Sequence, residues 1–140
     1  MAVGEAIDAR FPVPLLSKYS VHEWQAERSF GHPLGFGGKT DLCADDTDPP
    51  IVLDFKSKDV VDDRTRGYDE QAMQLAAYRE GLGYPDATCA NVFVTRSEPW
   101  TVRIHVWTEE ELQRAWVMFK CLLSYHKAQT KYDAAFEVVG

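Results

Sequence analysis

The sequence predicts an α/β protein whose central mixed sheet of about five strands is flanked by helices. Strands are indicated by short apolar or alternating runs at residues 51–56, 91–95 and 100–107. Helices are indicated by apolar residues three and four positions apart over residues 68–82 and 108–131. Strands and helices follow one another along the chain, which is typical of the α/β class.

The first part of the chain is expected to add one helix and two strands. Residues 3–10 predict a short helix, which Pro12 ends. Residues 19–30 predict an extended segment, and residues 34–44 predict a strand that begins with glycines. The 140 residues have the length of one domain. We divide residues 1–140 into an N-terminal helix or arm at 1–18, a sheet with its central helix at 19–107 and a C-terminal helix at 108–131.

Three further features define the later elements. The apolar run at residues 51–53 is expected at the centre of the sheet. The mixed charges of residues 57–67 predict a mobile loop. Thr108 is expected to cap the last helix, where three glutamates follow it. The stripe that this helix is expected to bury consists of Leu112, Ala115, Phe119, Leu122 and Leu123.

Composition limits the classes of protein to consider. The formal net charge is −7, and 45% of the residues are hydrophobic, which is enough for a core. A protein that only coats nucleic acid would be basic, because neutralising phosphates drives such binding. Bound cations, by contrast, can offset the carboxylates of a metal-dependent enzyme. The charge therefore weakens a binding-only function more than an enzymatic one.

The cellular compartment is predicted from what the sequence lacks. No apolar stretch approaches the length needed to cross a membrane, so no membrane contact is expected. Residues 1–5 have no basic start of a signal peptide. Cys43, Cys89 and Cys121 form no Cys-x-x-Cys pair, which argues against structural zinc and a disulfide framework. We expect a cytoplasmic protein with reduced thiols.

Asp54 and Lys56 come directly after the central apolar run. Residues two positions apart in a strand point to the same face of the sheet. Asp54 can therefore hold a divalent metal while Lys56 meets a water molecule or a phosphate. An isolated Asp-x-Lys is more often a surface ion pair that contributes little. The apolar run before it, and further motif positions on either side, favour a site here.

Asp41 is a candidate for a second carboxylate. On a strand adjacent and antiparallel to that of Asp54, it could share a Mg²⁺ ion, which usually takes one or two carboxylates. Gly37 and Gly38 precede it. These glycines either mark a strand bend or bulge or, by lacking side chains, let a phosphate backbone approach. Both interpretations can hold together.

Gln74 and Tyr78 lie four apart on the expected central helix and share one of its faces. Alone the pattern is weak, because a tyrosine on such a helix is more often a core residue. Coming after Asp54, Gln74 is a candidate to hold a phosphate or a water. Tyr78 could brace Lys56 or stack on a base. Together these residues suit metal-assisted phosphodiester cleavage, which needs a cation, an activated water and a stabilised leaving oxygen.

Three segments together resemble a known family. Gly35 to Asp41, Val52 to Lys58 and Gln74 to Tyr78 resemble the RecB-like branch of the PD-(D/E)xK nuclease superfamily. Within that branch they are most similar to phage-type and mitochondrial single-strand exonucleases. The resemblance covers about residues 20–82 and implies a restriction-endonuclease-like core.

The resemblance implies roles for the motif residues. Asp41, Asp54 and the backbone carbonyl of Phe55 would ligate Mg²⁺ or Mn²⁺. Lys56 would position the attacking water or help to deprotonate it. Gln74 and Tyr78 would support the site and the DNA. The resemblance thus implies catalytic roles for five residues: Asp41, Asp54, Lys56, Gln74 and Tyr78.

One position departs from the family pattern, and a further acid matches it. Relatives often carry a G-x-x-x-H helix whose His is a metal ligand, and here Gly4 is followed by Asp8 in that place. Asp8 is a candidate ligand, and a solvent-facing carboxylate is an equal alternative. Glu27 matches an acid that often precedes the glycine-rich strand and is a second candidate. The four cysteines that hold an iron–sulfur cluster in some relatives are absent from the sequence, so no cluster is expected.

The expected activity is that of a metal-dependent deoxyribonuclease, an exonuclease acting on DNA ends in recombination or repair, for which a phage origin would fit. The alternatives are a structure-selective or restriction-like endonuclease and a nucleic-acid-binding module without turnover. DNA that is single-stranded or has a free end is the expected partner; a homo-oligomer and a recombination protein partner stay open. The expected DNA contacts are Gly37, Gly38, Lys58, Arg64 and Arg66, with Lys120, Lys127 and Lys131 as either a solvated face or a DNA-guiding stripe.

Overall fold

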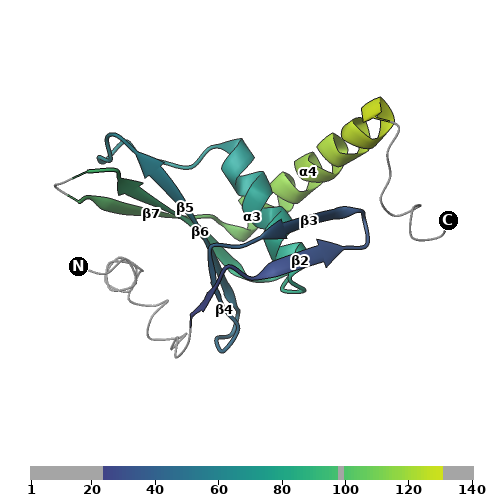
Figure 1. Ribbon diagram of the computed structural model, residues 1–140, viewed down its shortest axis with the longest axis horizontal. Coiled ribbons are helices and arrows are strands. Elements are labelled where there is room, and N and C mark those ends of the chain that lie inside the picture. The colour runs from purple at the N-terminus through teal and green to yellow at the C-terminus, as the bar shows by residue number, and fades with distance from the viewer. Residues whose placement is uncertain (1–23, 98–99, 131–140) are drawn as a thin grey trace.

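The computed structural model describes residues 24–97 and 100–130. The expected N-terminal helix at residues 3–10, including Asp8, lies outside the described residues, and so does Lys131. Figure 1 shows a sheet, a two-stranded arm beside two helices, and the last helix extending away from the sheet.

A mixed sheet of five strands forms the centre of the described fold. In spatial order it contains β1 (Gln25–Ala26), β4 (Leu42–Ala44), β5 (Ile51–Lys58), β6 (Thr88–Thr95) and β7 (Val102–Val106). All neighbouring strands are antiparallel except β5 and β6, which are parallel. The predicted α/β class, with a mixed sheet flanked by helices, is confirmed.

The apolar run at the start of β5 places this strand at the centre of the sheet, as expected. Ile51, Val52 and Leu53 are at most 2% exposed, because both faces of the strand are covered. Parallel neighbours need a crossover connection, and helix α3 (Asp69–Gly81) supplies it between β5 and β6. The strand runs to Lys58 and thus includes the whole Asp54-x-Lys56 motif.

The chain around β1 and β4 forms one long hairpin that bends. Its outer half is a separate two-stranded sheet of β2 (Ser29–His32) and β3 (Phe36–Lys39). Backbone hydrogen bonds continue across the bend, from Glu27 N to Asp41 O and from Thr40 N to Arg28 O. The extended segment predicted at 19–30, as far as it is described, and the strand predicted at 34–44 are each present as two strands, because the chain leaves the main sheet at this bend.

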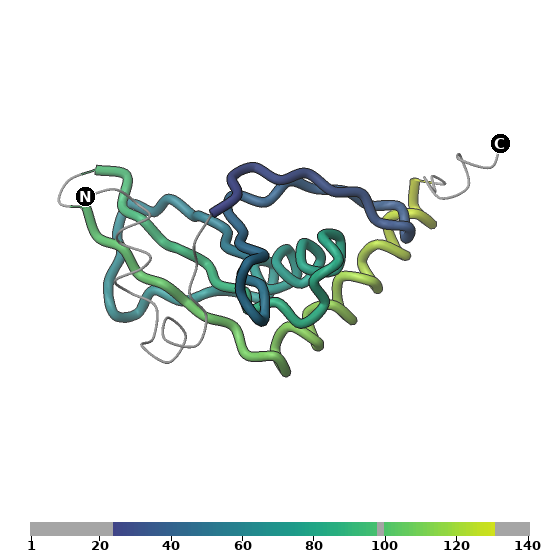
Figure 2. The backbone as a smooth tube through the Cα atoms, turned by 90° about the horizontal axis from the view of Figure 1, so that it is seen from below, coloured from purple at the N-terminus to yellow at the C-terminus, as the bar shows by residue number. Residues whose placement is uncertain are grey.

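Helices α3 and α4 (Glu109–Thr130) pack together, and residues of both join one face of the sheet in a single apolar core. Figure 2 shows the arm of β2 and β3 running alongside these helices. A smaller apolar cluster lies among Ile51, Leu53, Ala90 and Val92, whose neighbours include Ile104 of β7. The buried residues of the main core are Cys43, Val52, Ala72, Leu75, Ala76, Ala87, Cys89, Trp107, Leu112 and Ala115.

Thr108 begins α4 as predicted. Its hydroxyl accepts a hydrogen bond from the Glu111 N–H, and the Glu111 carboxylate accepts one from the Thr108 N–H, which is a capping box. Leu112 and Ala115 are buried as expected, but Leu122 is 54% exposed. The predicted stripe is wrong there, because α4 has by then run past the sheet. Neither described helix is long and apolar enough to cross a membrane.

The segment after β5 has more order than the predicted loop at 57–67. Residues 57 and 58 belong to β5. Beyond them, the Thr65 hydroxyl accepts a hydrogen bond from the Asp62 N–H, and the Arg103 side chain donates to the Thr65 carbonyl. Val61 and Thr65 are buried at 8% exposure. The mobility of the segment stays a prediction.

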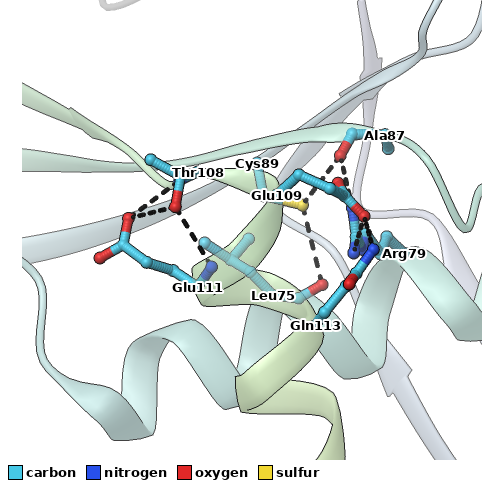
Figure 3. Close-up of polar contacts among 8 residues, drawn as sticks. All are labelled: Leu75, Arg79, Ala87, Cys89, Thr108, Glu109, Glu111 and Gln113. Atoms are coloured by element: carbon cyan, nitrogen blue, oxygen red, sulfur yellow. Dashed lines mark hydrogen bonds and ion pairs between the residues drawn. The ribbon is translucent and has the colours of Figure 1, made fainter.

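One buried cation joins the two helices (Figure 3). Arg79 of α3 is 2% exposed, and its guanidinium donates to both carboxylate oxygens of Glu109, at 2.6 and 2.9 Å. It also donates to the Ala87 carbonyl at 3.2 Å. The hydrogen bonds from Arg79 lower the pKa of Glu109. Because a buried charge without a partner is costly, the pair makes the packing of α4 on α3 specific.

Replacing Glu109 with Ala is expected to lower the free energy of unfolding by about 2 kcal/mol at pH 7. It leaves Arg79 buried without its carboxylate, and the half-exposed position of Glu109 admits some water, which keeps the loss below the range for fully buried pairs. Because the pKa of Glu109 is depressed in the folded state, this stabilisation is present at neutral pH and is lost as pH falls through its titration. Denaturant unfolding at pH 7 and at acid pH measures both effects.

The matched control is Glu110→Ala, which removes a carboxylate from the same first turn of α4. It should cost only the interaction with the helix dipole, about 0.5 kcal/mol. Equal losses for the two variants would show that the ion pair with Arg79 has no special weight.

Candidate active site

The site is built around Asp54, which points to the face of β5 that carries α3. Val52, on the same face, belongs to the core shared with that helix. Asp54 is 3% exposed. Its Oδ2 lies 3.0 Å from Lys56 Nζ and 3.4 Å from Asn91 Nδ2 on the neighbouring strand. A nearly buried carboxylate thus has one charged and one neutral partner.

The bend in the hairpin positions Asp41. Strand β4 begins at Leu42, which pairs with Leu53, so Asp41 lies beside Asp54 just before the strand, as the sequence predicted for neighbouring antiparallel strands. The Asp41 Oδ2 accepts a hydrogen bond from the Phe55 N–H at 2.8 Å. Asp41 therefore occupies the edge of β5 at the point where pairing with β4 has ended.

This hydrogen bond also orients the Phe55 carbonyl. The N–H and C=O of one residue in a strand point to the same side, which is why opposed residues can exchange both bonds. Since the Phe55 N–H points to Asp41, the Phe55 carbonyl oxygen faces the same open edge of β5. Two carboxylates and one carbonyl are thereby brought to one corner of the sheet.

Helix α3 adds Gln74 and Tyr78 to this corner. Lys56 Nζ donates to Gln74 Oε1 at 3.0 Å, and Gln74 Nε2 donates to the Tyr78 hydroxyl oxygen at 2.7 Å. A continuous hydrogen-bonded chain thus runs from Asp54 through Lys56 and Gln74 to Tyr78. The structure brings together all five residues whose catalytic roles the sequence predicted.

Burial and the neighbouring charges act in opposite directions on the ionisation of Asp54. Burial raises the pKa of Asp54 from 3.8 to about 6; Lys56 lowers this pKa, and the nearby Asp41 carboxylate raises it. Burial also raises the pKa of Tyr78, which keeps its hydroxyl protonated as a donor. Asp54 is therefore ionised at neutral pH against the combined effects of desolvation and a second carboxylate, and a cation would relieve both.

The donor set fits a small divalent ion. Mg²⁺ is commonly held by one or two carboxylates, with water and substrate phosphate completing its shell. Asp41, Asp54 and the Phe55 carbonyl offer oxygen atoms only, the type that Mg²⁺ and Mn²⁺ prefer. Within residues 24–97 and 100–130, no cluster of three or more His, Cys, Asp or Glu side chains gathers. Any ion here would depend on the two aspartates.

Other predicted site residues lie apart from this corner. The Glu27 carboxylate is exposed and faces Lys39 at 3.9 Å, so the structure does not bring it to the aspartates. Lys58 lies over the rings of Tyr68 and Phe93. Arg64 and Arg66 are exposed in the loop before α3 and line a separate groove, described below.

Gly38 has an internal packing role. A Cβ at this position would lie 2.9 Å from the rings of both Phe30 and Tyr78. The missing side chain thus lets the arm close on α3 and hold Tyr78. At Gly37 a Cβ would lie 3.0 Å from the Phe30 carbonyl. Gly37 and Gly38 pair in regular register inside β3, so the bend lies beyond them, at Thr40, and direct approach of DNA to the glycines stays a prediction.

Sequence reasoning missed Asn91. It is fully buried on β6 directly opposite Asp54, donates toward the Asp54 carboxylate and accepts from the Trp107 indole N–H at 2.8 Å. A polar residue at the start of the apolar run at 91–95 was the available signal. Asn91 connects the carboxylate to the main core through Trp107.

Comparison with known proteins adds information on the fold. No family model matches this chain, and no curated protein matches its sequence. Thirteen chains of solved structures match it in fold. A structure from Eubacterium rectale, named "Putative exonuclease", matches 79% of this chain and 45% of that chain, at 18% identity and a TM-score of 0.53. A protein named SSO0001 matches 84% of this chain and 58% of that one, at 13% identity and a TM-score of 0.44.

These similarities concern architecture. The chain spans about half the length of the solved structures it matches. At 18% identity, the Eubacterium rectale structure shows a shared α/β fold, a five-stranded mixed sheet flanked by two helices, consistent with a restriction-endonuclease-like core.

Asp54→Asn is expected to stabilise the protein in EDTA at pH 7 by about 1–2 kcal/mol. The folded-state pKa of Asp54 is raised, so the folded protein holds this proton more tightly than the unfolded chain and loses stability as pH rises from about 4 to 6. The amide introduced by Asp54→Asn cannot ionise, so the substitution removes the cost of ionising a buried carboxylate, which is at most about 3 kcal/mol for a rise of two pKa units. It also removes the ion pair with Lys56, which reduces the net gain in stability. Thermal unfolding at pH 4 and pH 7 measures the difference.

Asp86→Asn, on an exposed turn, is the control and should change little at either pH. A gain for Asp54→Asn that is the same at pH 4 as at pH 7 would contradict the assignment of the penalty to ionisation.

Proposed function

We propose that this protein is a divalent-metal-dependent deoxyribonuclease of the RecB-like PD-(D/E)xK type, which hydrolyses phosphodiester bonds from DNA ends. The proposal is supported above all by one observation: the buried Asp54 carboxylate, held between Asp41 and Lys56 at an open corner of the sheet. The core shared with the Eubacterium rectale structure, and the name of that protein, are consistent with it.

Mg²⁺ or Mn²⁺ is the proposed cofactor. When bound, such an ion neutralises charge on phosphate oxygens and makes a water molecule more acidic. Asp41, Asp54 and the Phe55 carbonyl would hold it. Asp54, ionised but desolvated, has the most to gain from a nearby cation.

Lys56 supplies a fixed positive charge beside the carboxylates. Its ammonium has three donors. One is directed to Asp54 and one to Gln74, which leaves a third to orient a water or a phosphate oxygen. As a point charge it can favour the deprotonated form of a neighbouring water.

Gln74 and Tyr78 hold Lys56 in place. Gln74 uses its carbonyl oxygen for Lys56 and its amide N–H for Tyr78. Because the Tyr78 oxygen accepts this bond, its own hydrogen remains able to donate to a phosphate. Both residues extend the site from the metal-binding corner toward the arm.

Cleavage of end-labelled linear and circular single-stranded DNA, with Mg²⁺, Mn²⁺ or EDTA, tests the proposed function. Metal-dependent release of nucleotides from linear DNA alone is expected. Cleavage of circles would show an endonuclease. Binding without cleavage under all metal conditions would show a module without turnover.

Lys56→Ala is expected to lower the cleavage rate by at least about a hundredfold while Mn²⁺ binding stays within a few fold of wild type. Lys56 acts here on water and phosphate, which fits the scale of general acid–base effects. Asp54→Asn should lose both cleavage and Mn²⁺ binding. Single-turnover cleavage and calorimetric titration with Mn²⁺ measure the two properties.

Lys39→Ala is the control, since Lys39 is an exposed lysine of the arm that faces Glu27. It should cleave at the wild-type rate. Turnover of Lys56→Ala near wild type would remove Lys56 from the proposed mechanism.

A basic groove is the proposed place for the DNA backbone. It encloses about 600 Å³ between the loop before α3 and strand β7, and its described lining holds three arginines, Arg64, Arg66 and Arg103, against one carboxylate, Asp63. His105 lines it too, and burial lowers the pKa of His105, which keeps the ring neutral near pH 7. Lys58, at the end of β5, lies over Tyr68, which also lines the groove.

Replacing Arg64 and Arg66 together with Ala is expected to weaken DNA binding and to reduce its salt dependence. Each lost phosphate contact lowers the slope of log K against log salt by about 0.7 on single strands. Two contacts therefore predict a slope smaller by about 1.4. Fluorescence anisotropy at several salt concentrations measures it.

The double variant Arg96→Ala and Arg114→Ala removes the same charge from exposed positions elsewhere. Its slope should change less. Equal slopes for the wild type and the Arg64 and Arg66 double variant would place the DNA backbone elsewhere.

A further inference from the structure

A second groove lies beside the catalytic residues, on the side of the arm. It encloses about 460 Å³ between the β2–β3 arm and helices α3 and α4, which lie side by side in both views (Figures 1 and 2). The arm contributes Phe30 and Phe36, α3 contributes Met73 and Tyr78, and α4 contributes Phe119. This volume lies within the range of small-molecule sites.

The groove is bordered by aromatic rings that are only partly buried. Phe36 meets Phe119 edge to face at a centroid distance of 4.8 Å and stacks on His32 at 4.7 Å. Phe30 meets Tyr78 at 5.5 Å. Each of these side chains keeps partial solvent exposure, so ring surface is left for a ligand.

The lining selects a neutral, flat ligand. Among the described residues that line the groove, Glu70 is the only charged one. An anionic phosphate inside it would meet a carboxylate and no cation. A planar aromatic group with polar edges can instead stack on the rings and meet the side-chain amide of Gln74, which is also in the lining.

The groove is continuous with the catalytic chain of hydrogen bonds. Gln74 and Tyr78 belong both to the groove and to the chain that reaches Lys56 and Asp54. A ligand seated there lies directly next to the residues proposed to hold the scissile phosphate. In a nucleic acid, the flat and neutral group nearest to a phosphate is a nucleobase.

Positive charge lies outside the groove lining, on two lysines of α4. Lys120 Nζ lies 5.4 Å from the Trp116 ring, which itself stacks on Phe119 at 5.8 Å. Lys127 donates to the carbonyl of Leu34 at the tip of the arm. Cations near an aromatic groove whose described lining holds no cation complement a strand whose bases enter and whose phosphates stay outside, and they disfavour a purely apolar peptide.

We propose that this groove binds one unpaired nucleobase adjacent to the scissile phosphate, and that Phe36 and Phe119 supply the stacking surface for the single-stranded DNA that the sequence predicts as the partner. The inference rests on the proposed nuclease function. A base inside a duplex is paired and stacked, and extracting it costs free energy. A base in a single strand enters without that cost and gains the stacking energy that aromatic platforms give to any base.

Phe36→Leu tests the groove, because it removes the ring that touches both Phe119 and His32 while keeping an apolar side chain on the arm. Binding of a single-stranded oligonucleotide by the Lys56→Ala protein in Mg²⁺ should weaken about tenfold when Phe36→Leu is added. Duplex binding should change less than twofold. A 2-aminopurine placed at each position near the end should change in fluorescence at one position, and Phe36→Leu should abolish that change.

An abasic oligonucleotide allows a double-mutant cycle between the base and the Phe36 ring. An abasic residue at the responding position should weaken binding to the Phe36 protein about tenfold and have no further effect in Phe36→Leu. Phe36→Trp, which keeps a ring, should retain the preference for single strands. Tyr125→Leu is the control, since Tyr125 is a 63% exposed aromatic residue of α4 that does not line the groove.

The outcomes separate this inference from the proposed function. Wild-type protein that cleaves no DNA with any metal contradicts the proposed function. Suppose that the wild type cleaves DNA. If Phe36→Leu then weakens the binding of normal and abasic strands equally, or leaves the preference for single strands over duplex unchanged, the groove is not a base site and only the inference is contradicted. Loss of folding in Phe36→Leu, seen by circular dichroism, would be resolved by Phe119→Leu, which opens the same groove from α4.

Discussion

The burial of the Asp54 carboxylate is the constraint on which the rest of the site depends. An aspartate at the end of an apolar central strand, 3% exposed, costs free energy that no single partner offsets. The fold surrounds it with Lys56 on its own strand, Asn91 on the next strand and Gln74 behind the lysine. Asp41, which raises the pKa of Asp54, is the one neighbour that acts against ionisation. The fold thus places two carboxylates close together at one corner of the sheet, where a bound cation would favour the ionised form of both.

Two other features keep that corner open and in place. The bend at Glu27 and Thr40 takes the outer strands off the main sheet, so beyond Leu53 the edge of β5 that faces β4 has no strand partner, and Asp41 occupies it. The Arg79 pair with Glu109 anchors α3 to the start of α4. Helix α3 thereby carries Gln74 and Tyr78, and its residues line the aromatic groove, whereas the basic groove lies beside the loop that precedes the helix.

Periodicity and local chemistry were enough to predict much of this fold. The apolar run at 51–53 indicated the central strand because only strands covered on both faces tolerate such a run. Thr108 with Glu111 three residues on indicated a helix start, because the reciprocal hydrogen bonds are local. Two-residue spacing placed Asp54 and Lys56 on one face, and four-residue spacing did the same for Gln74 and Tyr78. Each of these inferences needs only the geometry of one element.

Tertiary structure decided what no single element determines. Arg79 looks like an ordinary polar residue of a helix, yet it is buried because Glu109, thirty positions away, comes to meet it. Asn91 became part of the site only because parallel pairing put it opposite Asp54. Glu27 matched a sequence pattern, but the bend turned its carboxylate toward Lys39. Leu122 has the spacing of a core residue and is exposed because α4 outruns the sheet. The sequence by itself determined which residues share a face, since that depends on local backbone geometry; which faces meet depends on pairing register and packing between distant segments.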